Sequence, residues 1–126
     1  MTNILVDTSV WINHIKSKNE NLAEILERGI VRTHPLIIGE MACGTLNNRK
    51  QTLAMFNKMM QVKQANSTEV LTFIENEKLY GHGCGVVDIT ILASTIITPD
   101  TELWTADKQL IALAERFEVM YKPTVH

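Results

Sequence analysis

The chain lacks any run of about 18 uninterrupted apolar residues, which is the length that a membrane-spanning helix needs. Its first residues contain no basic cluster, and Asp7 interrupts their apolar stretch, so we expect no secretory signal. Only two cysteines are present, Cys43 and Cys84, and they form no C-x-x-C pair. We therefore expect a cytoplasmic protein with reduced thiols, Cys43 in the core and Cys84 in a loop.

The chain also lacks an excess of positive charge, because 12 basic and 14 acidic side chains give a net charge of −2. This balance excludes a protein that holds nucleic acid through charge alone. We find no internal repeat, low-complexity tract or linker among the 126 residues. Since domains typically contain about 100–150 residues, we expect one domain spanning residues 1–126.

Short apolar runs alternate with helical patterns along the chain, which predicts a parallel sheet with helices on both faces. A helix is expected to begin at Asn19 or Asn21 and to end at Gly29. Strands are expected at 3–7, 30–33, 102–105 and 119–121. Further helices are expected at 10–16, 36–46, 49–60, 69–80, 86–98 and 107–117.

Four acidic residues occupy positions where a carboxylate is costly. Asp7 ends the first expected strand, and Asp107 follows the third. Glu40 and Asp88 interrupt strongly apolar helical segments. Each acid has a simpler interpretation: the three aspartates can cap helices, and Glu40 can lie at an exposed helix edge. Because ligands bind beyond the carboxyl ends of parallel strands, a shared site is the stronger hypothesis for all four together.

A divalent cation would relieve the cost of these carboxylates, and hard oxygen ligands favour Mg²⁺ or Mn²⁺. Two such ions about 3.5–4 Å apart can activate water and stabilise the leaving oxygen in phosphoryl transfer. Thr8, Ser9 and Thr105 lie beside the acids and could orient water or phosphate, although each is also an ordinary cap or strand residue.

Four segments resemble PIN-domain ribonucleases, specifically the VapC-type toxins; they are residues 4–12, 34–44, 81–94 and 103–110. The resemblance implies a three-layer α/β/α sandwich and an endoribonuclease that depends on one or two Mg²⁺ or Mn²⁺ ions. It assigns the acidic tetrad to Asp7, Glu40, Asp88 and Asp107. It also implies a homodimer, an RNA substrate and a VapB-type antitoxin that blocks the site.

The chain departs from the family pattern at His82, where many relatives have Arg, and at Thr90, where some have His. We expect His82 to contact RNA from its glycine-rich loop without acting as the general base. Among the basic residues, we expect Lys108 to contact phosphate, with Arg32, Arg49 and Lys50 as further candidates.

The sequence is also compatible with two other functions. The first alternative is a PIN-like module that binds RNA or protein without cutting. The second is an aspartyl-nucleophile phosphatase, which is disfavoured because Ser9 occupies the position of its second aspartate. A dimer or antitoxin surface is expected around Trp11, Ile15, Phe56 and Met60, although core packing is the simpler role for Trp11.

Overall fold

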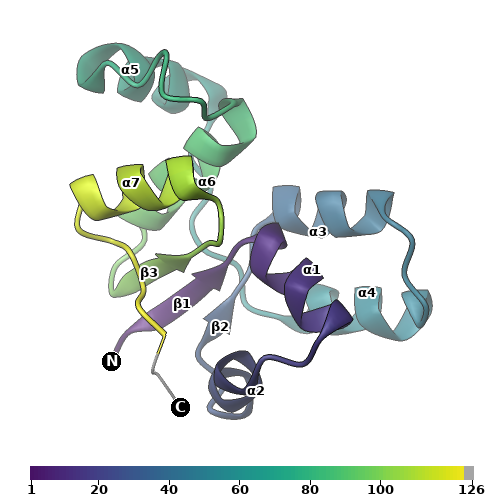
Figure 1. The fold of residues 1–126 in the computed structure, drawn as a ribbon. Coiled ribbons are helices and arrows are strands. Elements are labelled where there is room, and N and C mark those ends of the chain that lie inside the picture. Colours follow the sequence, from purple (N-terminus) through teal and green to yellow (C-terminus); the bar gives the residue numbers. More distant parts are fainter. Residues whose placement is uncertain (124–126) are drawn as a thin grey trace.

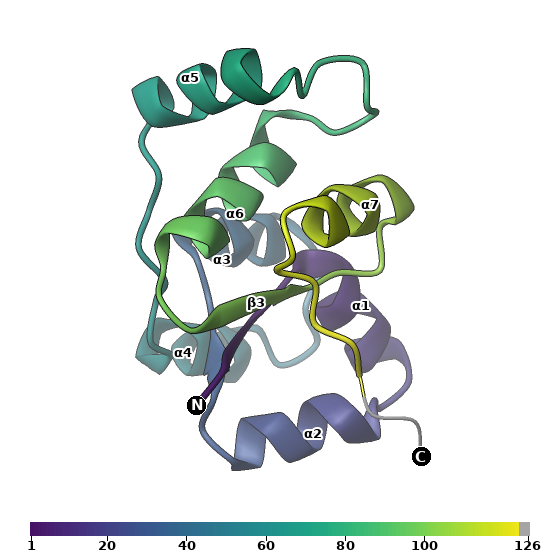
Figure 2. The ribbon, with the colours of Figure 1, turned by 90° about the vertical axis from the view of Figure 1, so that its left-hand side faces the viewer.

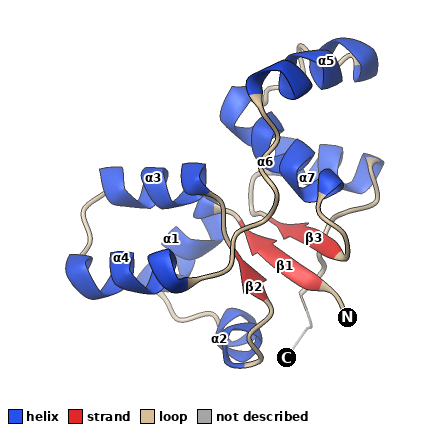
Figure 3. Cartoon of the chain, turned by 180° about the vertical axis from the view of Figure 1, so that it is seen from behind, coloured by secondary structure: helices blue, strands red, loops and turns tan. Residues whose placement is uncertain are grey.

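The computed structural model describes residues 1–123. Strands and helices alternate along the chain, as Figure 1 shows and as Figure 3 shows from behind. The elements are β1 (Asn3–Val6), α1 (Thr8–Lys16), α2 (Glu20–Glu27), β2 (Val31–Arg32), α3 (Pro35–Cys43), α4 (Arg49–Lys58), α5 (Ser67–Glu77), α6 (Val86–Ile97), β3 (Thr101–Trp104) and α7 (Lys108–Arg116).

The sheet has three parallel strands in the order β2-β1-β3, so β1 lies in the centre. Parallel strands need crossover connections, and the helices between them supply these. Both edges continue through single bridges, Thr33 with Gln61 beside β2 and Leu103 with Met120 beside β3. The exposed backbone groups of both edge strands are thereby partly covered.

Helices cover both faces of this sheet, and Figure 2 shows α4 and α6 on one side with α1 and α2 on the other. This arrangement confirms the predicted α/β/α sandwich with a parallel sheet. Right-handed twist and short connections favour this doubly covered arrangement when strands and helices alternate. The same topology brings the carboxyl ends of β1 and β3 together.

Polar side chains fix the ends of several helices. The Asn19 side chain accepts a hydrogen bond from the Leu22 amide, so α2 begins after Asn19. Asn21 instead donates to the Tyr121 hydroxyl over 2.7 Å. Arg49 donates to the carbonyls of Ala42 and Gly44, which ends α3 earlier than the expected residue 46.

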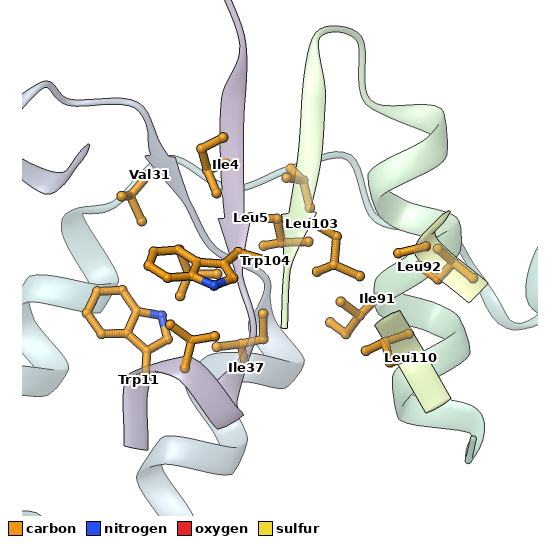
Figure 4. Packing of buried hydrophobic residues seen from close by; sticks show 14 of the residues in the cluster. Ile4, Leu5, Trp11, Val31, Ile37, Ile91, Leu92, Leu103, Trp104 and Leu110 are labelled. Carbon is orange, nitrogen blue, oxygen red and sulfur yellow. The ribbon is translucent and has the colours of Figure 1, made fainter. Parts of the chain in front are cut away.

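The core forms around β1, where Ile4, Leu5 and Val6 are buried on both faces. Leu5 and Leu103 lie against Leu92 of α6, while Trp11 lies on the α1 side (Figure 4). A strand buried on both faces must be apolar throughout, which explains the uninterrupted run before Asp7.

Trp11 and Phe56 belong to this core, so the expectation that they form a contact surface is wrong. Their rings meet edge to face with centroids 4.9 Å apart, and both side chains are buried. Ile15 and Met60 of the same expected surface are exposed. Helical periodicity shows which side chains share a face, but it does not show which face packs inward.

Three further expectations need correction. Residues 119–121 contribute one bridge to β3 and no full strand. Helix α4 ends at Lys58, because the following chain turns extended and Gln61 pairs with Thr33. Cys43 is exposed near the end of α3 and does not lie in the core.

Among residues 1–123, no helix is long and apolar enough to cross a membrane.

The Trp11–Phe56 contact makes Phe56→Ala the substitution in α4 with the largest expected cost. Removing a buried phenyl ring leaves a cavity, so the free energy of unfolding should fall by about 3–5 kcal/mol. Met60→Ala is the matched control, because Met60 is 66% exposed whereas Phe56 is 0% exposed. Urea unfolding measures both variants, and equal losses would contradict the assignment of Phe56 to the core.

Candidate active site

Asp7 is the central acid of the carboxyl edge. It directly follows the central strand β1 and is 5% exposed. It stands at the N-cap position of α1, but its side chain makes no capping hydrogen bond. The interpretation of Asp7 as an ordinary helix cap is therefore wrong. A buried carboxylate that does not cap its helix needs other partners.

Two hydroxyl groups supply those partners. Ser9 and Thr105 both donate to Oδ2 of Asp7, over 2.9 and 2.8 Å. In turn, the backbone amides of Ala106 and Asp107 donate to the Ser9 and Thr105 oxygens. This network joins the end of β1 to the end of β3 and holds one oxygen of Asp7 in place.

Asp107 combines two roles. Its Oδ1 accepts a hydrogen bond from the Leu110 amide over 3.0 Å, so Asp107 caps α7. This is one of the two roles that the sequence suggested for Asp107. The cap uses one carboxylate oxygen and leaves the other available to the site. Helix capping and participation in the acidic site are therefore compatible at this residue.

Asp88 and Glu40 approach the same edge from α6 and α3. Asp88 lies in the first turn of α6, after the Gly85 N-cap, and is half-buried. Glu40 is exposed, and its Oε1 accepts a hydrogen bond from the Thr8 hydroxyl over 2.7 Å. Thr8 is the first residue of α1, so Glu40 is tied to the segment that directly follows Asp7.

The pKa of the Asp88 carboxyl shows how these acids influence one another. Burial raises this pKa above its usual value, and the negative charges of Asp7, Asp107 and Glu40 raise it further. A hydrogen bond with the Gly85 backbone acts in the opposite direction. Each of the other three acids therefore lies within electrostatic reach of Asp88.

Cys84 lies close to the same charges, which the sequence did not indicate. Burial, followed by the charges of Asp88 and Asp107, raises the pKa of this thiol to about 11. The thiolate is therefore disfavoured at neutral pH, and Cys84 acts as a neutral neighbour of the acids. Its position four residues before Asp88 was the available signal.

The donor set suits a hard divalent cation, because it consists of carboxylates supported by hydroxyl groups. Within residues 1–123, no three Asp, Glu, His or Cys side chains are arranged closely enough to hold a metal ion together. The acids fit a divalent cation in the chemistry of their donor atoms.

Among the outer candidate residues, His82, Lys108 and Arg49 are exposed, whereas Thr90 and Arg32 are partly buried. The His82 ring lies in the loop before α6, with Nε2 3.1 Å from the Lys78 carbonyl oxygen. Lys108 is exposed at the start of α7, next to Asp107. Thr90 donates to the Val86 carbonyl, an ordinary hydrogen bond within α6. Arg32 and Arg49 donate to nearby backbone carbonyls, which places their guanidinium groups on the protein surface.

The PIN domain model matches residues 4–116, a range that includes all four acids. The chain belongs to the PIN domain family. Ribonuclease VapC32 of Mycobacterium tuberculosis, from strain CDC 1551 / Oshkosh and from strain ATCC 25618 / H37Rv, is 38% identical over 109 residues. Those residues are 86% of this chain and 88% of each relative. The resemblance to VapC-type PIN ribonucleases is thereby confirmed.

The raised pKa of Asp88 in this PIN domain predicts a pH-dependent stability. Because the pKa of Asp88 is raised, the folded chain binds this proton more tightly than the unfolded chain does. The free energy of unfolding should therefore fall as the pH rises from the ordinary carboxyl pKa to the raised pKa of Asp88. Asp88→Asn should therefore raise the melting temperature by a few degrees at neutral pH in chelator, and this gain should shrink towards about pH 4.

Thermal unfolding followed by circular dichroism between about pH 4 and pH 7.5 measures this difference. Glu75→Gln is the matched control, because it removes a negative charge from an exposed residue of α5 outside the acidic site. It should show no comparable gain. A destabilised Asp88→Asn at neutral pH would show that repulsion among the acids does not govern the site.

Proposed function

We propose that this chain is the endoribonuclease toxin of a type II toxin–antitoxin system and that its acidic tetrad holds the catalytic cation. The observation that carries the proposal is the influence of Asp7, Asp107 and Glu40 on the pKa of Asp88. Three acids from separate segments act on Asp88 at the edge where parallel sheets bind ligands. The similarity to a protein named as a ribonuclease supports RNA as the substrate.

Asp7, Glu40, Asp88 and Asp107 would hold one or two Mg²⁺ or Mn²⁺ ions. Such an ion supplies Lewis acidity that activates water and neutralises charge on the phosphodiester. The chain's own hydroxyl groups fix the acids: Ser9 and Thr105 hold Oδ2 of Asp7, while Thr8 holds Glu40. Lys108 and His82 would attract the RNA backbone at the rim of the site.

A VapB-type antitoxin is the second proposed partner. A groove of about 310 Å³ lies between α1 and α3. Apolar side chains, including Ile12, Ile15 and Leu46, line this groove, and Glu40 lies in the same lining. An apolar antitoxin segment with a basic side chain directed at Glu40 would fit this combination of surface and charge. That side chain would compete with the cation for the acids.

We also propose that the toxin is a homodimer and acts in the cytoplasm, where its RNA substrate is present. Several apolar side chains outside the groove between α1 and α3 are exposed, such as Leu71 and Val86. They provide surface for contact with a second copy. We further propose that residues 1–126 belong to a single PIN domain. A non-cleaving RNA-binding module with the same fold is the competing function, and the next two experiments distinguish it.

Asp7→Asn should abolish cleavage while leaving the fold intact. The amide keeps the shape of the carboxylate and can accept from Ser9 and Thr105, but it removes the charge and weakens binding of a hard cation. We expect a loss of at least about 100-fold in the cleavage rate with Mn²⁺, measured on labelled RNA. Growth inhibition after induced expression should disappear in parallel.

Asp100→Asn is the control in this assay, since it makes the same chemical change at the amino end of β3, whereas Asp7 lies at the carboxyl end of β1. This control should cut RNA at the wild-type rate, and chelator should stop both active proteins. Wild-type cleavage by a folded Asp7→Asn variant would overturn the metal assignment. Absence of cleavage by pure wild-type protein with either cation would favour the non-cleaving module.

His82 is expected to assist RNA binding without taking part in the chemistry. Its ring is exposed, and Nε2 contacts the Lys78 carbonyl, so a modest rotation would turn the ring towards a bound phosphate. His82→Ala should weaken RNA binding by about three- to tenfold, the cost of one exposed polar contact. His82→Arg should bind and cut at least as well as wild type, because a guanidinium group can donate two hydrogen bonds to one phosphate.

Single-turnover cleavage with saturating RNA and Mn²⁺ separates binding from chemistry. Under these conditions His82→Ala should approach the wild-type rate. A loss as large as that of Asp7→Asn would place His82 among the catalytic residues. Titration of Mn²⁺ onto the alanine variant should give the wild-type affinity, since His82 is not one of the proposed ligands.

A further inference from the structure

The loop between α5 and α6 carries an exposed aromatic side chain. Tyr80 is 61% exposed, whereas every other Phe, Trp and Tyr side chain of residues 1–123 is buried or half-buried. None of the ring contacts among these residues involves Tyr80. Single exposed apolar side chains are common, so the position of this ring decides whether it has a role.

The loop follows α7 from its end to its start. Glu77, the last residue of α5, pairs with Arg116 at the end of α7, with Oε2 and Nη2 3.1 Å apart. Further along the loop, a Cβ on Gly83 would lie 3.0 Å from Cγ of Gln109, in the first turn of α7. Tyr80 lies in the chain between these two contacts, and Figure 2 shows this loop above α7.

The loop reaches the acidic site at Cys84. The charges of Asp88 and Asp107 both act on this thiol, so Cys84 lies beside two acids of the tetrad. Tyr80 precedes Cys84 by four residues, which span at most about 14 Å of extended chain. A few nucleotides of an RNA strand cover that distance. The ring is therefore placed to contact RNA beside the acids and not at them.

The backbone gives the loop a defined shape. Gly81 and Gly83 have positive φ angles of 78° and 79°, which residues with a Cβ rarely adopt. Leu79, directly before Tyr80, is buried in the core, and its amide donates to the Ile74 carbonyl over 3.0 Å. The backbone at Tyr80 is thus held in place before any ligand binds, which lowers the entropic cost of binding.

We propose that Tyr80 binds an unpaired base of the RNA substrate by stacking, on one side of the cleaved phosphodiester. Aromatic rings stack with unpaired bases, and cations beside them hold the phosphates. Lys78 and His82 are exposed on either side of Tyr80, so the loop offers both kinds of contact. Glu77, the nearest acid along the chain, is paired with Arg116. This assignment rests on the proposed endoribonuclease function and adds a residue that positions the substrate.

A protein is the less suitable occupant of this surface. Protein contacts depend on contiguous apolar patches around their aromatic side chains. The exposed neighbours of Tyr80 along the loop are instead Lys78, Gly81 and His82. This composition favours a ligand that presents a flat ring and negative charge together, as RNA does.

Tyr80→Ala should weaken RNA binding. Fluorescence anisotropy measures it with a labelled single-stranded RNA that the wild type cuts at a mapped position, in an Asp7→Asn background that is not expected to cut. We expect the dissociation constant to rise at least about fivefold, since one base–aromatic stack is lost. Tyr80→Phe should bind like the parent protein, because the ring makes the stack. Met60→Ala is the matched control at a similarly exposed side chain beside β2, and it should leave RNA affinity unchanged.

An abasic scan of the same RNA locates the stacked base. Each base is replaced in turn by an abasic nucleotide, and binding should weaken at one position near the cut. That loss should be absent in the Tyr80→Ala protein, because the two changes remove the same contact. Without the Asp7→Asn change, single-turnover cleavage by Tyr80→Ala at saturating RNA and Mn²⁺ should approach the wild-type rate, since the ring touches no reacting atom.

Several results would overturn the assignment. They are unchanged RNA affinity of a folded Tyr80→Ala protein, a Tyr80→Phe protein as weak as Tyr80→Ala, and equal abasic losses with and without the ring. Loss of antitoxin binding with full RNA affinity would overturn it too, because Tyr80 would then contact protein. Wild-type cleavage is measured in parallel, so these results leave the proposed enzyme intact. Absence of cleavage by the wild type would overturn the proposed function itself, and this inference with it.

Discussion

Ionising Asp88 is costly, because its carboxyl group is half-buried and lies within reach of three other acids. Burial and three neighbouring negative charges oppose ionisation of Asp88, and no lysine or arginine compensates them among the causes of its raised pKa. A chain of this size has little stability to spare, since folded proteins are stable by only about 5–15 kcal/mol. An arrangement that costs stability in the free protein is typical of a functional site. The proposed divalent cation would remove that cost by supplying the opposite charge.

The fold provides the framework that holds these acids together. Parallel strands bring Asp7 and Thr105 to the same edge, where the Ser9 and Thr105 hydroxyls hold one oxygen of Asp7. Glu40 reaches this edge through its bond to Thr8. The groove between α1 and α3 borders this framework, because Glu40 is also one of its lining residues.

Sequence patterns predicted the alternating parallel fold because β1 is apolar on both faces and the helices carry clear start and stop residues. They also identified the acids, since Glu40 and Asp88 interrupt apolar helices. They did not predict that Trp11 and Phe56 pack together. Helical periodicity shows which side chains share a face, but it does not show whether that face points into the core. Nor did they indicate the pairing of Gln61 with Thr33 or the position of Cys84, which depend on contacts between distant segments.

The most direct test of the central claim is a crystal structure of the protein with Mn²⁺, in which anomalous scattering locates the ion. Manganese scatters anomalously and prefers the same hard oxygen ligands as Mg²⁺. We expect Mn²⁺ bound by Asp7, Asp88 and Asp107, with Glu40 turned towards the same site. The hydrogen bonds from Ser9 and Thr105 to Asp7 should be retained. Manganese found only elsewhere, or an acid of the tetrad directed away from the bound ion, would contradict it.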